Sequence, residues 1–167
     1  MDLSPYYAWI VLVHVLAAFA FTVAHGVSAF VAFGVRGERD PARIRVLLEL
    51  SARSMGVAYG SLLVLLLAGI LAGIVGGFFG RLWIWASIVL LVAVLVAMYA
   101  LASSYYARVR QAVGQRTYQM PKDAPDPTPL SPPELAALLE NRRPELVALV
   151  GYGGLAVLIW LMVMKPF

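Results

Sequence analysis

The sequence contains no cysteine and few charged residues. Of its 167 residues, 13% are charged and 62% are hydrophobic, and the mean hydropathy is +0.83. A soluble domain is closer to half apolar and a quarter charged, so this chain has too little polar surface to cover itself in water. The absence of cysteine excludes disulfides, thiolate metal sites, iron–sulfur clusters and covalently attached haem. The composition therefore predicts an integral membrane protein.

Acidic side chains are missing from every long apolar stretch. Ion-coupled transporters and proton pumps usually carry an Asp or Glu inside the membrane, so neither class is expected. The sequence also shows no Ser-His-Asp set, no nucleotide-binding loop and no zinc motif. These absences argue against a hydrolase or a primary pump and favour a protein without enzymatic activity.

Four apolar stretches are long enough to cross a bilayer as helices. The hydrocarbon core is about 30 Å thick and takes roughly 20 helical residues to cross. Only helices and closed barrels satisfy the backbone in lipid, and these long runs lack the alternation of barrel strands. We predict an all-α fold, a polytopic four-transmembrane-helix bundle in a single domain, residues 1–167. The spans are about 6–35, 55–79, 82–107 and 146–164, with loops at 36–54 and 108–145.

Basic residues are concentrated in two of the loops. Residues 36–54 and 108–145 hold eleven Lys or Arg, whereas the rest of the chain holds two, Arg81 and Lys165. Cytoplasmic loops carry such an excess, so we expect both termini outside and both long loops in the cytoplasm of a bacterial inner membrane. The net charge of +4 then belongs to loops that face anionic lipid, and no nucleic-acid partner is expected. The tryptophans fall at the expected outer ends of the spans: Trp9, Trp83, Trp85 and Trp160.

Local signals place helical structure inside the first loop and a tight turn after the second span. Asp40 followed by Pro41 is typical of a helix N-cap with proline at the first helical position. This pattern predicts one long helix from about 41 to 79. Only Gly80 and Arg81 separate spans two and three, so these two helices should form an antiparallel hairpin.

The loop before the fourth span is rich in proline. Residues 115–134 are therefore expected to be extended and poorly regular. Ser131 and Glu134 form a capping-box pattern with prolines between them. It predicts a short amphipathic helix over about 132–141, lying on the membrane surface.

Glycines repeat every four residues in the second span, at Gly69, Gly73 and Gly77. Small residues at this spacing let two helix backbones approach closely. We expect these glycines to pack against another helix of the same bundle. A dimer contact is the alternative.

Both histidines of the chain, His14 and His25, lie in the first span. They are eleven residues apart, which places them on one side of a helix and about 16 Å apart along its axis. One histidine should lie in each half of the bilayer. Helical b-type cytochromes hold one haem near each leaflet through histidines stacked in this way. The alternative is structural, with each imidazole hydrogen-bonded to a neighbouring helix.

The second ligand of such a site is harder to assign, because no other helix contains a histidine. Bis-histidine ligation needs two copies of the first helix in a dimer. Otherwise a methionine must serve, and Met98 lies at the depth of His25, while Met162 and Met55 lie nearer the span ends. Copper is the alternative to haem b, because imidazole and thioether ligands suit Cu(I).

Short motifs of the chain resemble those of known membrane protein families. The stretches VHVLAAFAFTVAHGVSAF, RGERDPARIRVLLELSARS and GRLWIW resemble an uncharacterised family of small bacterial four-helix integral membrane proteins. More distantly, His14 in its Leu-Val-His-Val-Leu setting resembles the copper-resistance D family and related haem-associated four-helix proteins. The resemblance implies a four-helix membrane fold with haem or copper binding. The better understood relatives carry ligand histidines on more than one helix, and this chain does not.

Three functional interpretations follow. The first is an electron-transfer or redox accessory subunit that binds haem b through His14 and His25, with Met98 as a further ligand. The second is a scaffold or accessory subunit of a larger membrane complex. The third is an oligomeric permease for a small solute or copper. All three place the protein in a lipid bilayer, as a homo-oligomer or as a subunit of a membrane complex.

Overall fold

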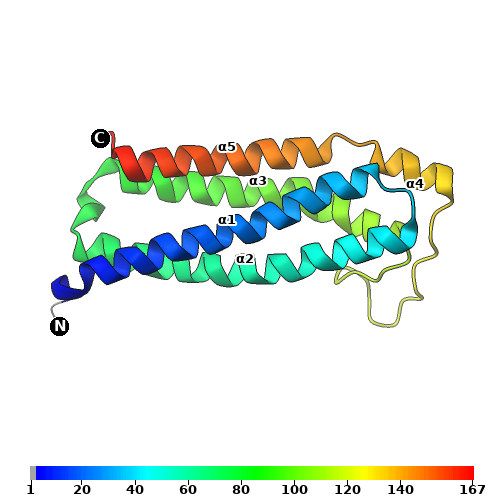
Figure 1. Ribbon diagram of the computed structural model, residues 1–167, viewed down its shortest axis with the longest axis horizontal. Coiled ribbons are helices and arrows are strands. Elements are labelled where there is room, and N and C mark those ends of the chain that lie inside the picture. Colours follow the sequence, from blue (N-terminus) through cyan, green and yellow to red (C-terminus); the bar gives the residue numbers. More distant parts are fainter. Residues whose placement is uncertain (1–2) are drawn as a thin grey trace.

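The chain forms a bundle of four long helices that run alternately up and down (Figure 1). The computed structural model describes residues 3–167, so the first two residues of the predicted domain lie outside it. The long helices are α1 (Tyr7–Gly37), α2 (Pro41–Val75), α3 (Leu82–Ala112) and α5 (Arg143–Met164). The described residues also form three short helices: η1 (Ser4–Tyr6), η2 (Phe78–Gly80) and α4 (Pro132–Leu139).

Each of the four long helices is long and apolar enough to cross a membrane. The predicted all-α, four-span membrane protein is thus confirmed. Both termini and the connection between α2 and α3 lie at one end of the bundle, which we call the termini end (Figure 1). The α1–α2 turn, the long loop after α3 and helix α4 lie at the other, the loop end.

Helix α2 begins where its capping signal predicts and ends earlier than expected. The side chain of Asp40 accepts a hydrogen bond from the N–H of Ala42 at 2.9 Å, and Pro41 takes the first helical position. The helix stops at Val75, four residues before the predicted end. Gly77 follows with φ +67°, a left-handed conformation that glycine adopts without steric cost, and it turns the chain into η2.

The long helices associate as two pairs, α1 with α2 and α3 with α5. The predicted hairpin of spans two and three is wrong in its packing: α2 and α3 run antiparallel but touch at few points. The reason is the early end of α2. It leaves residues 76–81, including η2, as a connection wide enough to hold the two helices apart.

Small residues form the contacts between α1 and α2. Ala17 and Ala24 are buried on α1, and Ala58 is fully buried on α2. The hydroxyls of Ser28 on α1 and Ser51 on α2 are 2.6 Å apart and share a hydrogen bond. Helices in lipid usually associate by close approach of their backbones through small side chains. Large apolar side chains gain little free energy from helix contact there, because lipid is as apolar as they are.

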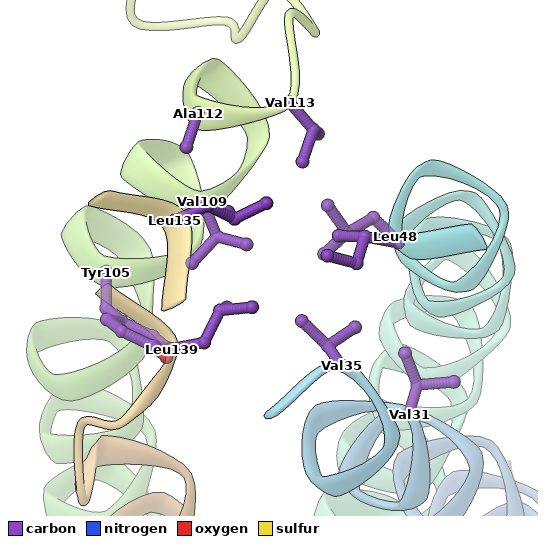
Figure 2. Packing of buried hydrophobic residues seen from close by; sticks show 10 residues of the cluster. Val31, Val35, Leu48, Tyr105, Val109, Ala112, Val113, Leu135 and Leu139 are labelled. Carbon is purple, nitrogen blue, oxygen red and sulfur yellow. The ribbon is translucent and has the colours of Figure 1, made fainter. Parts of the chain in front are cut away.

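The largest cluster of buried apolar side chains lies at the loop end, where α1, α2, α3 and α4 meet. Figure 2 shows side chains from these helices pointing toward one another. The cluster, here called the loop-end core, consists of Val31, Val35, Ile44, Leu48, Tyr105, Val109, Ala112, Val113, Leu135 and Leu139.

Helix α4 belongs to this core. Leu135 and Leu139 are 2% and 0% exposed, so the helix inserts its apolar face between the ends of the long helices. The prediction that it lies on the membrane surface stays a prediction, and the structure adds that its apolar face packs against the bundle. Its start is as predicted: the carboxylate of Glu134 accepts from the N–H of Ser131 at 3.0 Å.

The loop end extends past the thickness of a membrane. Helix α2 has 35 residues and is therefore about 52 Å long, against about 30 Å of hydrocarbon. Its apolar run starts at Met55, and the residues before it include Arg43, Arg45 and Arg53. The surplus length is thus at the loop end, and it carries the loop-end core.

The proline-rich loop is compact. Arg116 donates hydrogen bonds to the carbonyls of Ala124, Pro121 and Lys122, and its guanidinium pairs with Asp126 at 3.2 Å. The segment is poorly regular, as predicted, with no helix or strand over residues 115–131. It is not extended over residues 117–124, because one guanidinium satisfies several carbonyls there that would otherwise need water. The N–H of Leu130 donates to the carbonyl of Ala112 at 2.9 Å and returns the loop to the end of α3.

Candidate functional site

Side chains from α1, α3 and α5 meet around His25 in the middle of the bundle. The ring of Phe21 stacks on the imidazole with the ring centroids 5.8 Å apart. The ring of Tyr152, on α5, meets it edge-on at 5.8 Å. His25 is thus held by aromatic rings from its own helix and from a neighbouring one.

Gly151 on α5 brings His25 and Met98 together. A Cβ atom on Gly151 would lie 3.0 Å from Nε2 of His25 and 3.4 Å from Sδ of Met98. Two atoms at those distances from one point cannot be further apart than the sum of the two distances. The imidazole nitrogen and the thioether sulfur therefore both pack against the backbone of Gly151, which is possible because residue 151 has no side chain.

His14 lies in a different interface. Its Nδ1 is 2.9 Å from the carbonyl oxygen of Leu65 on α2, a hydrogen bond between the two helices. A Cβ atom on Gly69 would lie 2.8 Å from Cε1 of the imidazole, so the ring rests directly on the backbone of α2. This arrangement matches the structural alternative for His14.

The two histidines thus share one side of α1 without sharing a site. Helix α1 runs obliquely across the bundle, beside α2 near the termini end and closer to α5 toward the loop end (Figure 1). The same side of α1 therefore meets α2 at His14 and meets α3 and α5 at His25. The predicted set of His14, His25 and Met98 is reduced to one pair, His25 with Met98.

Space around His25 decides which group the pair is able to hold. A porphyrin needs open space on all sides of the axial nitrogen, and here the backbone of α5 at Gly151 lies against Nε2. A single ion needs only the gap between two donor atoms. Across residues 3–167, no group of three or more His, Asp or Glu side chains is placed to hold a metal ion. The donors at this place are one imidazole and one thioether, a set that suits Cu(I).

The glycine row of the second span has three different roles. Gly69 receives the ring of His14, and Gly73 lies against Phe79 and Ile84, where a Cβ atom would approach their side chains to 2.9 Å and 3.0 Å. Gly77 lies beyond the end of α2, with open space around its Cβ position. Its predicted role in helix packing is wrong, because the helix has already ended.

Polar side chains inside the spans bond to nearby partners and form no row. The hydroxyl of Thr22 donates to the carbonyl of Ala18 at 2.8 Å, and that of Ser87 donates to Trp83 at 2.8 Å. Trp83 itself is buried against Phe78, with ring centroids 5.5 Å apart. The hydroxyls of Thr22 and Ser87 are thus occupied by carbonyls of their own helices. They do not form a polar path of the kind that a permease needs.

Sequence reasoning missed Gly151 and Tyr152, which complete the surroundings of His25. The signal was present in the run Gly151-Tyr152-Gly153-Gly154, an unusual cluster of glycine in an apolar span. Gly154 packs against the side chain of Val94 in the same α3–α5 interface. No protein-family model matches the chain, and neither a curated protein nor a solved structure is significantly similar to it.

Proposed function

We propose that the protein binds a single Cu(I) ion between His25 and Met98 in the membrane-spanning part of the bundle. The observation that carries this proposal is the approach of Nε2 of His25 and Sδ of Met98 to one point beside Gly151, at 3.0 Å and 3.4 Å.

The chemistry of the pair supports copper over other metals. Thioether sulfur is a soft ligand that selects Cu(I), whereas Mg²⁺ and Ca²⁺ need oxygen ligands, and the site has none of their carboxylates. A monovalent ion also suits a site without acidic residues, since no second charge has to be neutralised inside the membrane. The rings of Phe21 and Tyr152 hold the imidazole in place, which favours a fixed position for its donor nitrogen.

The protein is proposed to sit in a bacterial cytoplasmic membrane with its loop end inside. Eleven of its thirteen Lys and Arg residues belong to the loop end, and cytoplasmic loops carry such an excess. A C-terminal alkaline phosphatase fusion should be active and a C-terminal green fluorescent protein fusion dark. The opposite pair of results would reverse the orientation.

Copper binding is tested on the full chain purified in detergent, without oxygen. Cu(I) is titrated against a chromophoric chelator for wild type, Met98→Leu and the matched control Met162→Leu. Wild type and the control should each take up one Cu(I), and Met98→Leu should bind at least about tenfold more weakly because it loses the sulfur and keeps the shape. X-ray absorption should show one nitrogen and one sulfur scatterer near the ion.

Two results would contradict the proposal. One is a wild-type protein that takes up no Cu(I), which would leave His25 as a structural residue like His14 and favour a scaffold subunit. The other is a Soret band in protein purified from haem-supplied cells that His25→Gln abolishes. That band would favour a b-type haem and an electron-transfer role, with a second copy of the chain opening the space that the porphyrin needs.

A further inference from the structure

An open pocket of about 460 Å³ lies beside α2 at the loop end. It mixes charged and apolar side chains on α2 with one residue of the loop that follows α3. Its lining consists of Arg45, Val46, Glu49, Leu50, Arg53 and Gln115. This pocket is far along α2 from the contact with His14, and no contact described so far uses it.

The pocket carries an excess of positive charge. Glu49 pairs with Arg53 at 3.3 Å, which leaves Arg45 without an acidic partner in the lining. Arg110 adds a second charge from behind, because its guanidinium donates to the side chain of Gln115 at 3.2 Å and to the carbonyl of Leu48 at 2.7 Å. Arg45 donates through Nε to the carbonyl of Val113, so that bond does not use its terminal N–H groups.

An exposed apolar stripe leads from the pocket into the membrane-spanning part of α2. It consists of Val46, Leu50, Val57 and Val64, all exposed. Steps of four and seven residues return to nearly the same direction on a helix, so these four side chains lie on one side of α2. Val46 and Leu50 line the pocket itself, whereas Val57 and Val64 lie beyond Arg53, within the apolar run that an acyl chain can reach.

We propose that this pocket binds the phosphate headgroup of an anionic membrane lipid, whose acyl chain lies along the apolar stripe. Arg45 and Arg53 are separated by about 12 Å along the helix, and Arg53 lies at the start of the apolar run. Guanidinium groups donate two parallel hydrogen bonds to phosphate. The arginines provide the charge that an anionic headgroup needs, and the stripe provides the contact that its chain needs.

The stripe distinguishes a lipid from a soluble anion. A free phosphate would use the guanidinium groups and leave Val57 and Val64 uncovered. A lipid uses both parts, and its headgroup is held at the level of Arg53 by its own position in the bilayer. Glu49 lowers the net charge of the pocket, so its removal should strengthen the binding of an anionic headgroup.

The test is native mass spectrometry of the full chain from nanodiscs of equal phosphatidylglycerol and phosphatidylcholine. Wild type should retain phosphatidylglycerol in preference to phosphatidylcholine. The preference should fall about fivefold in Arg45→Gln and in Arg53→Gln, and should be unchanged in Arg81→Gln, a matched control at the termini end. Glu49→Gln should raise it. Added inorganic phosphate should not displace the lipid.

Three results would overturn the proposal. They are an equal retention of both lipids by wild type, an unchanged preference in both arginine variants, and displacement of the lipid by millimolar phosphate. If the arginine variants do not fold, Glu49→Gln still decides the matter, because a structural role of this carboxylate would leave lipid retention unchanged or lower it.

Discussion

The loop end and the middle of the bundle are held together in different ways. At the loop end, large apolar side chains such as Leu139, Ile44 and Val109 are completely buried. In the middle, large side chains such as Phe19 and Leu67 are exposed, at 71% and 60%, and the contacts are made by alanine, glycine and serine. In water, the hydrophobic effect favours the burial of large apolar side chains. In lipid, close van der Waals packing of the helix backbones favours association instead. We expect the boundary between the two kinds of packing to lie near the level at which the chain leaves the hydrocarbon.

The largest effect that this comparison predicts is at the loop end. Leu139→Ala removes a fully buried side chain from the loop-end core and should lower the free energy of unfolding by about 3 kcal/mol. Chemical unfolding in detergent measures it. Leu149→Ala is the matched control, since Leu149 is 71% exposed on α5, and it should change stability by less than about 0.5 kcal/mol. Similar values for the two would show that the loop-end core does not dominate stability.

The next effect concerns the middle of the bundle. Gly69→Ala places a methyl group 2.8 Å from the ring of His14, which is fixed by its bond to Leu65. We expect a loss of about 1–2 kcal/mol from overpacking. Gly60→Ala on the same helix has open space around it and should instead gain about 0.5 kcal/mol from helix propensity. If both variants stabilise the protein, α1 and α2 do not depend on close approach at residue 69.

A smaller effect is expected in the proline-rich loop. Arg116→Gln removes the guanidinium that bonds Ala124, Pro121 and Lys122. Because this arginine is partly exposed, the loss of stability should be only about 1 kcal/mol. Proteinase K should cleave between residues 115 and 130 faster than in wild type. Lys122→Gln, whose own side chain makes none of these bonds, should leave the rate unchanged.

The smallest effect depends on pH and lies in the α1–α2 turn. The backbone N–H groups of Asp40 and Arg39, together with the nearby guanidinium of Arg43, hold the pKa of Glu38 below its usual value. A lowered carboxyl pKa means that Glu38 stabilises the turn above the usual value of about 4.3, and that this contribution is lost as the pH falls through the lowered pKa. Glu38→Gln should reduce stability at pH 7 and leave it unchanged once the pH is below the lowered pKa of Glu38.

Hydrogen exchange at the amides of residues 39 and 40 follows the turn directly. The ratio of protection between wild type and Glu38→Gln should approach one in acid. A ratio that stays constant from pH 7 to pH 3 would show that the two hydrogen bonds do not depend on the charge of the carboxylate.

Much of the fold was predictable because it follows from local patterns. Apolar runs gave the four spans, and Asp40 with Pro41 gave the start of α2. The pairing of helices was not predictable, because it depends on which small residues face which partner. The short separation between spans two and three indicated a hairpin, yet the left-handed Gly77 lengthens the turn and separates α2 from α3.

The candidate site was predictable in part. Depth along the helices placed His25 level with Met98, and the structure brings the two together. The prediction that His14 belongs to the same site used only the direction of the side chains on α1. It could not include the oblique path of α1, which carries His14 to α2. Nor could it include Gly151, which lies on another helix, 126 residues further along the chain than His25.

The oblique path of α1 makes this helix a mechanical link. His14 is fixed to the backbone of α2 through Leu65, and eleven residues further along His25 sits between α3 and α5. A helix is stiff over three turns, so a rotation of α1 that moves one imidazole must move the other. A rigid rotation of α1 would therefore change its contact with the carbonyl of Leu65 and its contacts with α5 at the same time.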